Sequence, residues 1–271
     1  MENYIQQAKT EEKNTIQYYV DKCKLFYGIT MCWVNLTAIA IILGPVLLSQ
    51  PFPIVVRYPF HVNYQPLNTI IYLHHTMAVY QSNVHVCANV FLALLLWFVA
   101  ARFEILSHKF QQVTNFSEFM ICIKLHQQLL RYAKDVTRAV RYIALSSIGF
   151  STSAVVFSGL IFLSKSPLTI KAQFFTVAAS SLVEVFICAW PADYLLRMSY
   201  DISQAVYHSI WYNKGLALQK DSLYIVLRSQ QPVTVTVPCM LPTLSLSYYA
   251  SYLSTAFSYL TTFRAVFVEN D

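Results

Sequence analysis

The sequence predicts an all-α, polytopic membrane helix bundle. Of its 271 residues, 56% are hydrophobic and only 12% are charged, whereas soluble domains carry roughly 25% charged residues. The apolar residues stand in long blocks, and about 20 such residues are enough to cross the hydrocarbon core as a helix. These two observations exclude a soluble domain, and the count of only 5 glycines excludes a collagen-like chain.

Five blocks are long enough to span a bilayer. The fifth block is rich in Ser, Thr and Tyr, but it carries no charge before Arg264. The predicted spans are 26–49, 67–101, 140–163, 168–196 and 242–268. They leave an N-terminal segment at 1–25, connections at 50–66, 102–139, 164–167 and 197–241, and a tail at 269–271.

The basic residues predict the orientation of these spans. With the N-terminus inside, 15 of the 19 Lys and Arg residues fall in the inner segments. The positive-inside rule therefore places 1–25, 102–139 and 197–241 in the cytoplasm, and 50–66, 164–167 and the C-terminal tail outside. The net charge of +6 is thereby explained by membrane topology, and we expect no nucleic-acid partner.

No enzymatic or metal-binding motif stands out. GxSxG, HExxH, GxxxxGK and GxGxxG are all missing from the sequence. His74 and His75 lie about 15 Å along a helix from His85, too far to share one ion, so the better interpretation is that they line a cavity or form hydrogen bonds to a neighbouring helix. We expect no catalytic residue, no metal and no cofactor.

Two polar patterns stand in the later spans. Asp193 lies four residues before Arg197, which predicts an ion pair on one helix face. In the last span, hydroxyl residues recur at intervals of four, three, four and four, and so share one face: Ser247, Ser251, Ser254, Ser258 and Thr262. Such a stripe either lets helices pack closely or lines a water-filled pore, and the pattern alone slightly favours packing.

A longer pattern covers the C-terminal half. Its elements, in order, are Cys188, Ser199, Ala205, Tyr207, Trp211, Arg228 and Pro232, followed by Ser258-Tyr259 in the last span. The order and spacing resemble the C-terminal signature of the insect odorant receptor family. The outer-loop stretch RYPFHVNYQPLN and the stretch LHQQLL at 125–130 also fit, so the resemblance covers almost the whole chain.

The resemblance implies a seven-span fold with a cytoplasmic N-terminus, the orientation predicted above from charge. The five spans would correspond to the third to seventh of the family. The first two would be missing, together with one wall of the odorant pocket, so we expect a truncated product.

The resemblance also implies a function. Family members resemble ligand-gated cation channels, hetero-tetramers in which a tuning subunit assembles with a coreceptor (Orco), and the seven signature residues would belong to the packed intersubunit anchor. The last span would line the pore, with a gate at Thr262 and Val266, so the hydroxyl stripe is now better interpreted as pore-lining. The candidate pore residues are Ser254, Ser258, Tyr259, Thr262 and Val266.

The expected ligand is a small volatile hydrophobic molecule, bound in an outer-leaflet cavity in the plasma membrane of olfactory sensory neurons. Its candidate contacts are Ile42, Val46, Thr76, Val79, Tyr80, Phe174, Phe175 and Ala178, although for each one alone ordinary helix packing is the commoner role. Two alternatives stay open. One is a G-protein-coupled chemoreceptor, which would need the opposite orientation; the other is a non-conducting product that competes for the coreceptor.

Overall fold

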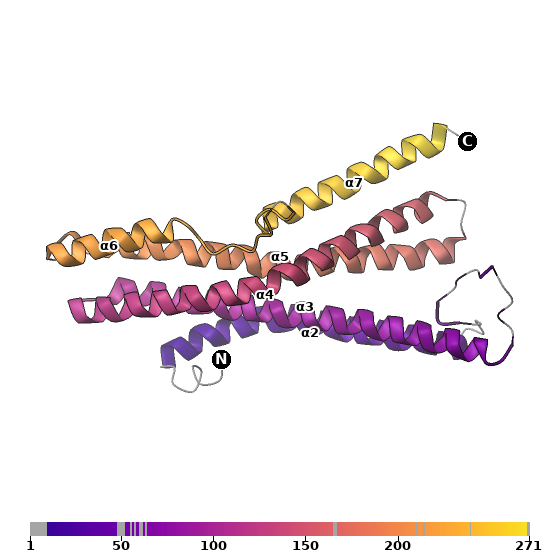
Figure 1. Ribbon diagram of the computed structural model, residues 1–271, viewed down its shortest axis with the longest axis horizontal. Helices are drawn as coiled ribbons and strands as arrows, with labels where there is room; N and C mark the ends of the chain where they lie inside the picture. Colours follow the sequence, from indigo (N-terminus) through magenta and orange to yellow (C-terminus); the bar gives the residue numbers. More distant parts are fainter. Residues whose placement is uncertain are drawn as a thin grey trace. The chain divides into compact units, whose positions relative to one another are not determined.

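The protein is entirely helical apart from its connections. The computed structural model describes residues 10–47, 52–54, 56, 58–59, 62, 64–164, 167–209, 211–213, 215–238 and 240–269. Its helices are α2 (Thr10–Leu47), α3 (Leu67–Gln112), α4 (Phe116–Leu163), α5 (Leu168–His208), η1 (Trp211–Asn213), α6 (Leu216–Ser229) and α7 (Leu246–Glu269) (Figure 1). The predicted all-α fold is confirmed.

The four long helices extend well beyond the predicted spans. They contain 38, 46, 48 and 41 residues, which makes each about 55–70 Å long, roughly twice the hydrocarbon thickness. Much of the predicted cytoplasmic segments at 102–139 and 197–241 is therefore helix. Hydropathy marks where charged residues begin, and a helix can continue through them because its backbone hydrogen bonds are internal.

Within the described residues, four helices are long and apolar enough to cross a membrane: α2, α3, α4 and α5. The fifth predicted span contains α7, a helix of 24 residues, which is not among them. Its Ser, Thr and Tyr residues lower its hydropathy, so its place in the membrane stays a prediction.

The chain divides into two compact units. The smaller unit, residues 20–91, contains most of α2 and the first half of α3. Its two helices are joined by polar contacts: the Tyr72 hydroxyl donates to the Ile42 carbonyl (3.2 Å) and the Asn83 amide to the Asn35 amide oxygen (3.1 Å). His75 Nε2 lies 2.9 Å from the hydroxyl of Tyr58, which belongs to the connection before α3 and not to a neighbouring helix as the sequence predicted.

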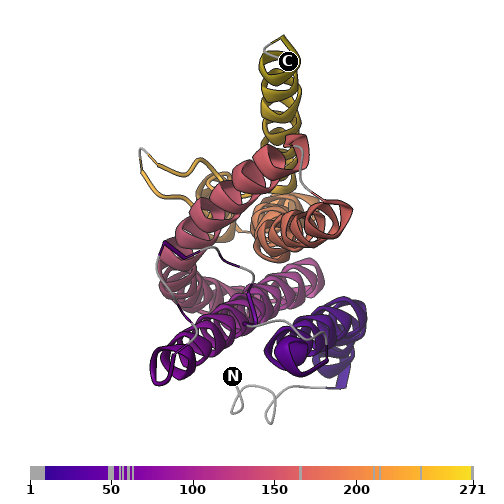
Figure 2. The same cartoon turned by 90° about the vertical axis from the view of Figure 1, so that its right-hand side faces the viewer.

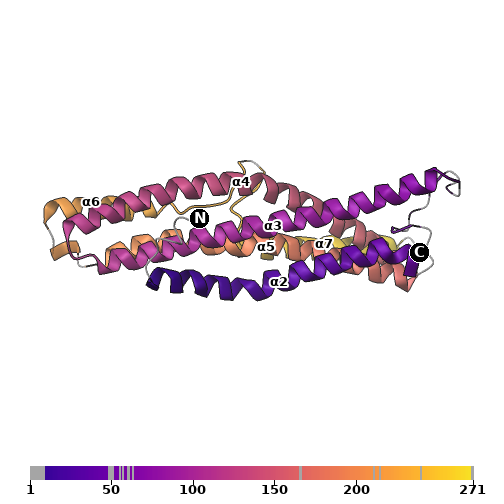
Figure 3. The same ribbon diagram turned by 90° about the horizontal axis from the view of Figure 1, so that it is seen from below.

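The larger unit, residues 1–19 and 92–271, contains the main core. In this unit α4 packs against α5, and α6 lies along the end of α5 (Figure 1); Figure 3 shows the same helices from below. The core lies where α4 and α5 meet the second half of α3, and its side chains are almost completely buried, as at Leu96, Phe103, Val140, Ile187, Leu195 and Ile202.

Aromatic rings connect this core to α7. Trp97 of α3 contacts Trp190 of α5, with ring centroids 5.1 Å apart, and Trp190 stacks on Phe186 at 5.7 Å. Phe186 in turn lies 5.4 Å from Tyr249 of α7. Such pairs add about 0.5–1.5 kcal/mol each beyond their buried area, so α7 is attached to the core through α5.

Candidate functional site: the α7 helix and its supports

The N-terminus of α7 is held by a carboxylate from α5. The backbone N–H of Leu246 donates to Asp193 Oδ1 (3.2 Å), while Asp193 Oδ2 pairs with Arg197 Nε (3.0 Å). The Tyr248 N–H donates to the Ser245 hydroxyl (3.2 Å), as at a conventional helix N-cap. The predicted Asp193–Arg197 pair is confirmed, and Asp193 has a second role that the sequence did not show, because Leu246 is 53 residues away.

The connection that precedes α7 is also fixed to α5. The Val233 N–H donates to the hydroxyl of Ser199 (2.9 Å), and that hydroxyl donates to the Leu196 carbonyl (2.9 Å). Further along, the Leu244 N–H donates to the Val235 carbonyl (2.9 Å). Ser199, one of the signature residues, therefore binds the segment between α6 and α7.

The other signature residues lie in different surroundings. Cys188 and Ala205 are buried on α5, whereas Tyr207 is exposed. The Trp211 indole donates to the Tyr207 carbonyl (3.2 Å), and Arg228 donates to the Gln231 carbonyl (3.4 Å) just before the half-buried Pro232. Ser199, Cys188 and Ala205 thus serve this chain's own packing, and the intersubunit anchor remains a prediction for the set.

The hydroxyl stripe of α7 faces away from the rest of its unit. Within the described residues, its five members, Ser247, Ser251, Ser254, Ser258 and Thr262, are all exposed. The residues that are half-buried, such as Tyr249, Tyr252 and Ala256, lie on the arc toward α4 and α5. Figures 1 and 2 show α7 at one edge of the unit. The stripe is therefore not used for helix packing within the described part of this chain.

The stripe presents oxygen atoms outward. The Thr262 hydroxyl donates to the Ser258 carbonyl (2.9 Å), and the Ser251 hydroxyl donates to the Ser247 carbonyl (3.1 Å). These bonds to the preceding turn use the hydroxyl protons and leave lone pairs free to accept from water or to contact a cation. Of the other pore candidates, Tyr259 is 53% exposed, and the side chain of Val266 lies outside the described residues.

The candidate odorant contacts are divided between the two units. In the smaller unit, Val79 is buried, Ile42 and Thr76 are half-buried, and Val46 and Tyr80 are exposed. In the larger unit, Phe174 and Ala178 of α5 are half-buried and Phe175 is 64% exposed. The pocket that residues of both units would share stays a prediction.

Comparisons with known proteins agree with this architecture. The sequence matches the model of the family "7tm Odorant receptor" over residues 2–257. It is 27% identical over 160 residues to Odorant receptor Or2 of Anopheles gambiae (57% of this chain, 40% of that protein). It is 28% identical over 148 residues to Odorant receptor 10 of Aedes albopictus (54% of this chain, 38% of that protein). The alignments thus span about 40% of the length of these two relatives.

The fold has a solved counterpart. The structure of the olfactory receptor OR5 of Machilis hrabei in complex with eugenol superposes with a TM-score of 0.79 and 14% sequence identity, and the match covers 99% of this chain and 73% of that chain. The structure of OR5 without eugenol superposes with the same TM-score of 0.79 and 15% identity, over 97% of this chain and 73% of that chain. At that identity the likeness shows the fold alone. Together with the family match over nearly the whole sequence, it establishes that the chain belongs to the insect odorant receptor family.

Proposed function

We propose that this chain is a subunit of a ligand-gated cation channel in which α7 lines the pore. The observation that carries the proposal is the hydroxyl stripe, exposed along α7 while the opposite arc of the helix packs on α4 and α5. Membership of the odorant receptor family supports a role in chemoreception rather than catalysis.

The chemistry of the stripe suits a hydrated cation. The outward oxygens of Ser251 and Thr262 solvate a cation better than an anion, because these two hydroxyls already donate their protons to the Ser247 and Ser258 carbonyls. A single subunit gives only one wall, so neighbouring subunits have to complete the conduit. We propose that those neighbours include the family's coreceptor, in the plasma membrane of olfactory sensory neurons.

The gating stimulus would be a small volatile hydrophobic molecule bound near the outer halves of the helices. Phe174, Phe175 and Ala178 lie on α5, the helix that also holds the start of α7 through Asp193. A ligand that shifts α5 is thereby linked to α7 through one rigid element. It opens the pore only if it binds the open arrangement more tightly than the closed one.

Paired charge substitutions at one stripe position test the proposal. The chain is co-expressed with a family coreceptor, and currents evoked by a panel of volatiles are recorded together with surface expression. Ser258→Glu should raise cation conductance and Ser258→Lys should lower it, because the charge lines the conduit. Equal conductance in the two variants at equal surface expression would contradict the pore assignment. Surface expression without any evoked current would favour the non-conducting alternative.

A further inference from the structure

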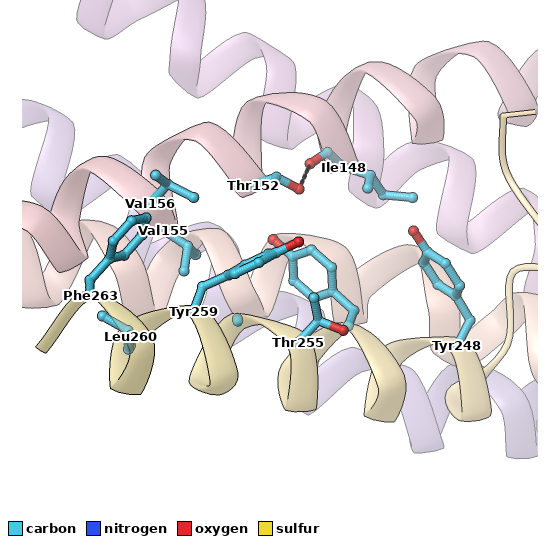
Figure 4. Close-up of a pocket in the computed structure, with 11 residues that line it drawn as sticks. Ile148, Thr152, Val155, Val156, Tyr248, Thr255, Tyr259, Leu260 and Phe263 are labelled. Atoms are coloured by element: carbon cyan, nitrogen blue, oxygen red, sulfur yellow. Dashed lines mark hydrogen bonds between the residues drawn. The ribbon is translucent and has the colours of Figure 1, made fainter. Parts of the chain in front are cut away.

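A cavity separates the middle of α4 from α7. Its volume is about 230 Å³, and Figure 4 shows Tyr248 projecting from α7 toward Ile148 of α4, with Tyr259 of α7 beneath Thr152. None of the eight predicted odorant contacts lines it. We propose that this cavity binds a small neutral molecule with one aromatic or alicyclic ring and one hydroxyl or carbonyl group, at a site distinct from the predicted odorant pocket.

The walls determine the class of ligand. They are mostly apolar and aromatic, with Val155 and Ile148 on α4 and Phe263 on α7, so they favour a neutral ring over a charged group. A cavity of about 150 Å³ is known to hold benzene. The larger volume here accommodates a substituted ring. Tyr259, at the rim, is 53% exposed, which leaves an entrance for a molecule dissolved in the bilayer.

One polar group in the wall calls for a partner. The buried Tyr252 hydroxyl lies beside the Thr152 hydroxyl, but it makes no hydrogen bond of normal geometry among the described residues. The neighbouring Thr152 hydroxyl donates to the Ile148 carbonyl (2.7 Å), so only its lone pairs remain available. A ligand oxygen could accept from Tyr252, and a ligand hydroxyl could also donate to Thr152. An acyl chain satisfies neither group, so we assign the site to the small polar-substituted ring.

The two helices touch closely just beyond the cavity. A Cβ atom added at Gly159 of α4 would collide with the end of the Leu260 side chain of α7, so the helices approach there as closely as a glycine allows. A ligand in the cavity would keep the helices apart next to this fixed contact and so restrict the tilt of α7. This consequence for gating depends on the proposed pore role of α7, whereas the binding itself does not.

Photoaffinity labelling tests the binding. The full chain, co-expressed with coreceptor and purified in lipid nanodiscs, is irradiated with a benzyl alcohol that carries an aryl diazirine, and labelled peptides are identified by mass spectrometry. We expect adducts on 148–156 of α4 and 248–263 of α7. Unmodified benzyl alcohol in excess should reduce them at least about tenfold, as for a saturable pocket.

Two matched pairs of variants locate the site. Thr152→Phe places a ring in the cavity and should abolish labelling, whereas Ser153→Phe adds the same ring at the next position of α4, outside the cavity, and should leave labelling unchanged. Tyr252→Phe removes the buried hydroxyl and should weaken competition by benzyl alcohol about tenfold, as for a lost hydrogen bond to a buried partner. Tyr249→Phe, on α7 but outside the cavity, should have no effect.

The outcomes distinguish a failure of the proposed cavity site from a failure of the channel proposal. Adducts spread evenly over lipid-facing residues, or unchanged in Thr152→Phe, would overturn the site, as would a fatty acid that competes better than benzyl alcohol. Saturable labelling that Thr152→Phe abolishes would establish the site even if no current were recorded, in which case only the channel proposal would fail.

Discussion

The two halves of α5 are built differently. Between 185 and 206, apolar side chains such as Ile187, Leu195 and Ile202 are at most 1% exposed. Between 168 and 180, no described residue is buried, and Phe175 is 64% exposed. One continuous helix therefore has a tightly packed half on the predicted cytoplasmic side and an open half on the predicted outer side.

The difference suggests that the two halves of α5 have different roles. Close packing resists change, because displaced atoms lose contacts or collide, so the inner half holds the subunit together. The outer half leaves surface exposed, which could serve the ligand and the neighbouring subunits proposed above. Asp193 lies on the packed half and holds the start of α7, whereas the cavity beside α7 is lined by residues of α4 and α7.

Truncating one large side chain in each half should give the largest contrast. Leu195→Ala in the packed half should lower the free energy of unfolding by about 3 kcal/mol, because it leaves a cavity in a filled core. Phe175→Ala in the open half should change it by less than about 0.5 kcal/mol. Thermal unfolding of the detergent-solubilised protein measures both, and equal losses would remove the distinction between the halves.

His126, on α4 in the packed core of the larger unit, should make the stability of that core depend on pH. Burial against Phe103 and Phe110, with a smaller effect of the Arg228 charge, lowers the pKa of His126 to about 4. The unfolded chain, with a pKa near 6.5, binds the proton more readily. The His126 contribution to stability is therefore complete above about pH 6.5 and is lost as the pH falls toward 4, at up to about 1.4 kcal/mol per pH unit.

Stability measured from pH 7.5 to 4.5 checks this prediction. His126→Gln should flatten the profile over that range, while the exposed His108, changed in the same way, should leave the slope as it is. A parallel decline in the wild type and His126→Gln would mean that other groups cause it.

The support of α7 by the packed half can be tested at Asp193. Asp193→Ala should cost about 1–2 kcal/mol, because the Leu246 N–H and Arg197 both lose their partner. Hydrogen exchange at the first turn of α7 should accelerate. Arg197→Gln keeps the carboxylate and should leave that exchange nearly unchanged; if both variants accelerate it equally, the carboxylate does not act as a cap.

The smallest effect is expected at the α4–α7 contact in the looser region. Gly159→Ala should cost about 1 kcal/mol, since only the flexible end of Leu260 has to move. Adding Leu260→Ala should make the glycine substitution neutral in a double-mutant cycle. Additive effects of the two substitutions would show that the residues do not touch.

Local patterns predicted the fold better than they predicted the contacts. Hydropathy located the four long helices, and the spacing of Ser247, Ser251 and Ser258 predicted a shared face that the structure leaves exposed. These features repeat within one helix and are visible in a single segment. The helix ends were not visible, because charged residues continue the helices beyond the predicted spans.

The supports and the cavity could not be predicted, because they join distant segments. Asp193 looked like half of a local ion pair, and nothing in the sequence relates it to Leu246. Likewise, Gly159 meets Leu260 across 101 positions. A glycine within an apolar span does hint at a close helix contact, but the hint does not identify the partner.

Cysteine accessibility along α7 tests the pore assignment most directly. Ser254, Ser258 and Thr262 are replaced one at a time by cysteine, with Tyr249→Cys on the packed arc and the unsubstituted chain as controls. The variants are co-expressed with coreceptor and treated with a charged thiol reagent from the aqueous side. The account predicts that the three stripe positions react, faster when ligand is present, and that position 249 does not. Stripe positions that stay unmodified with and without ligand, at normal surface expression, would contradict it.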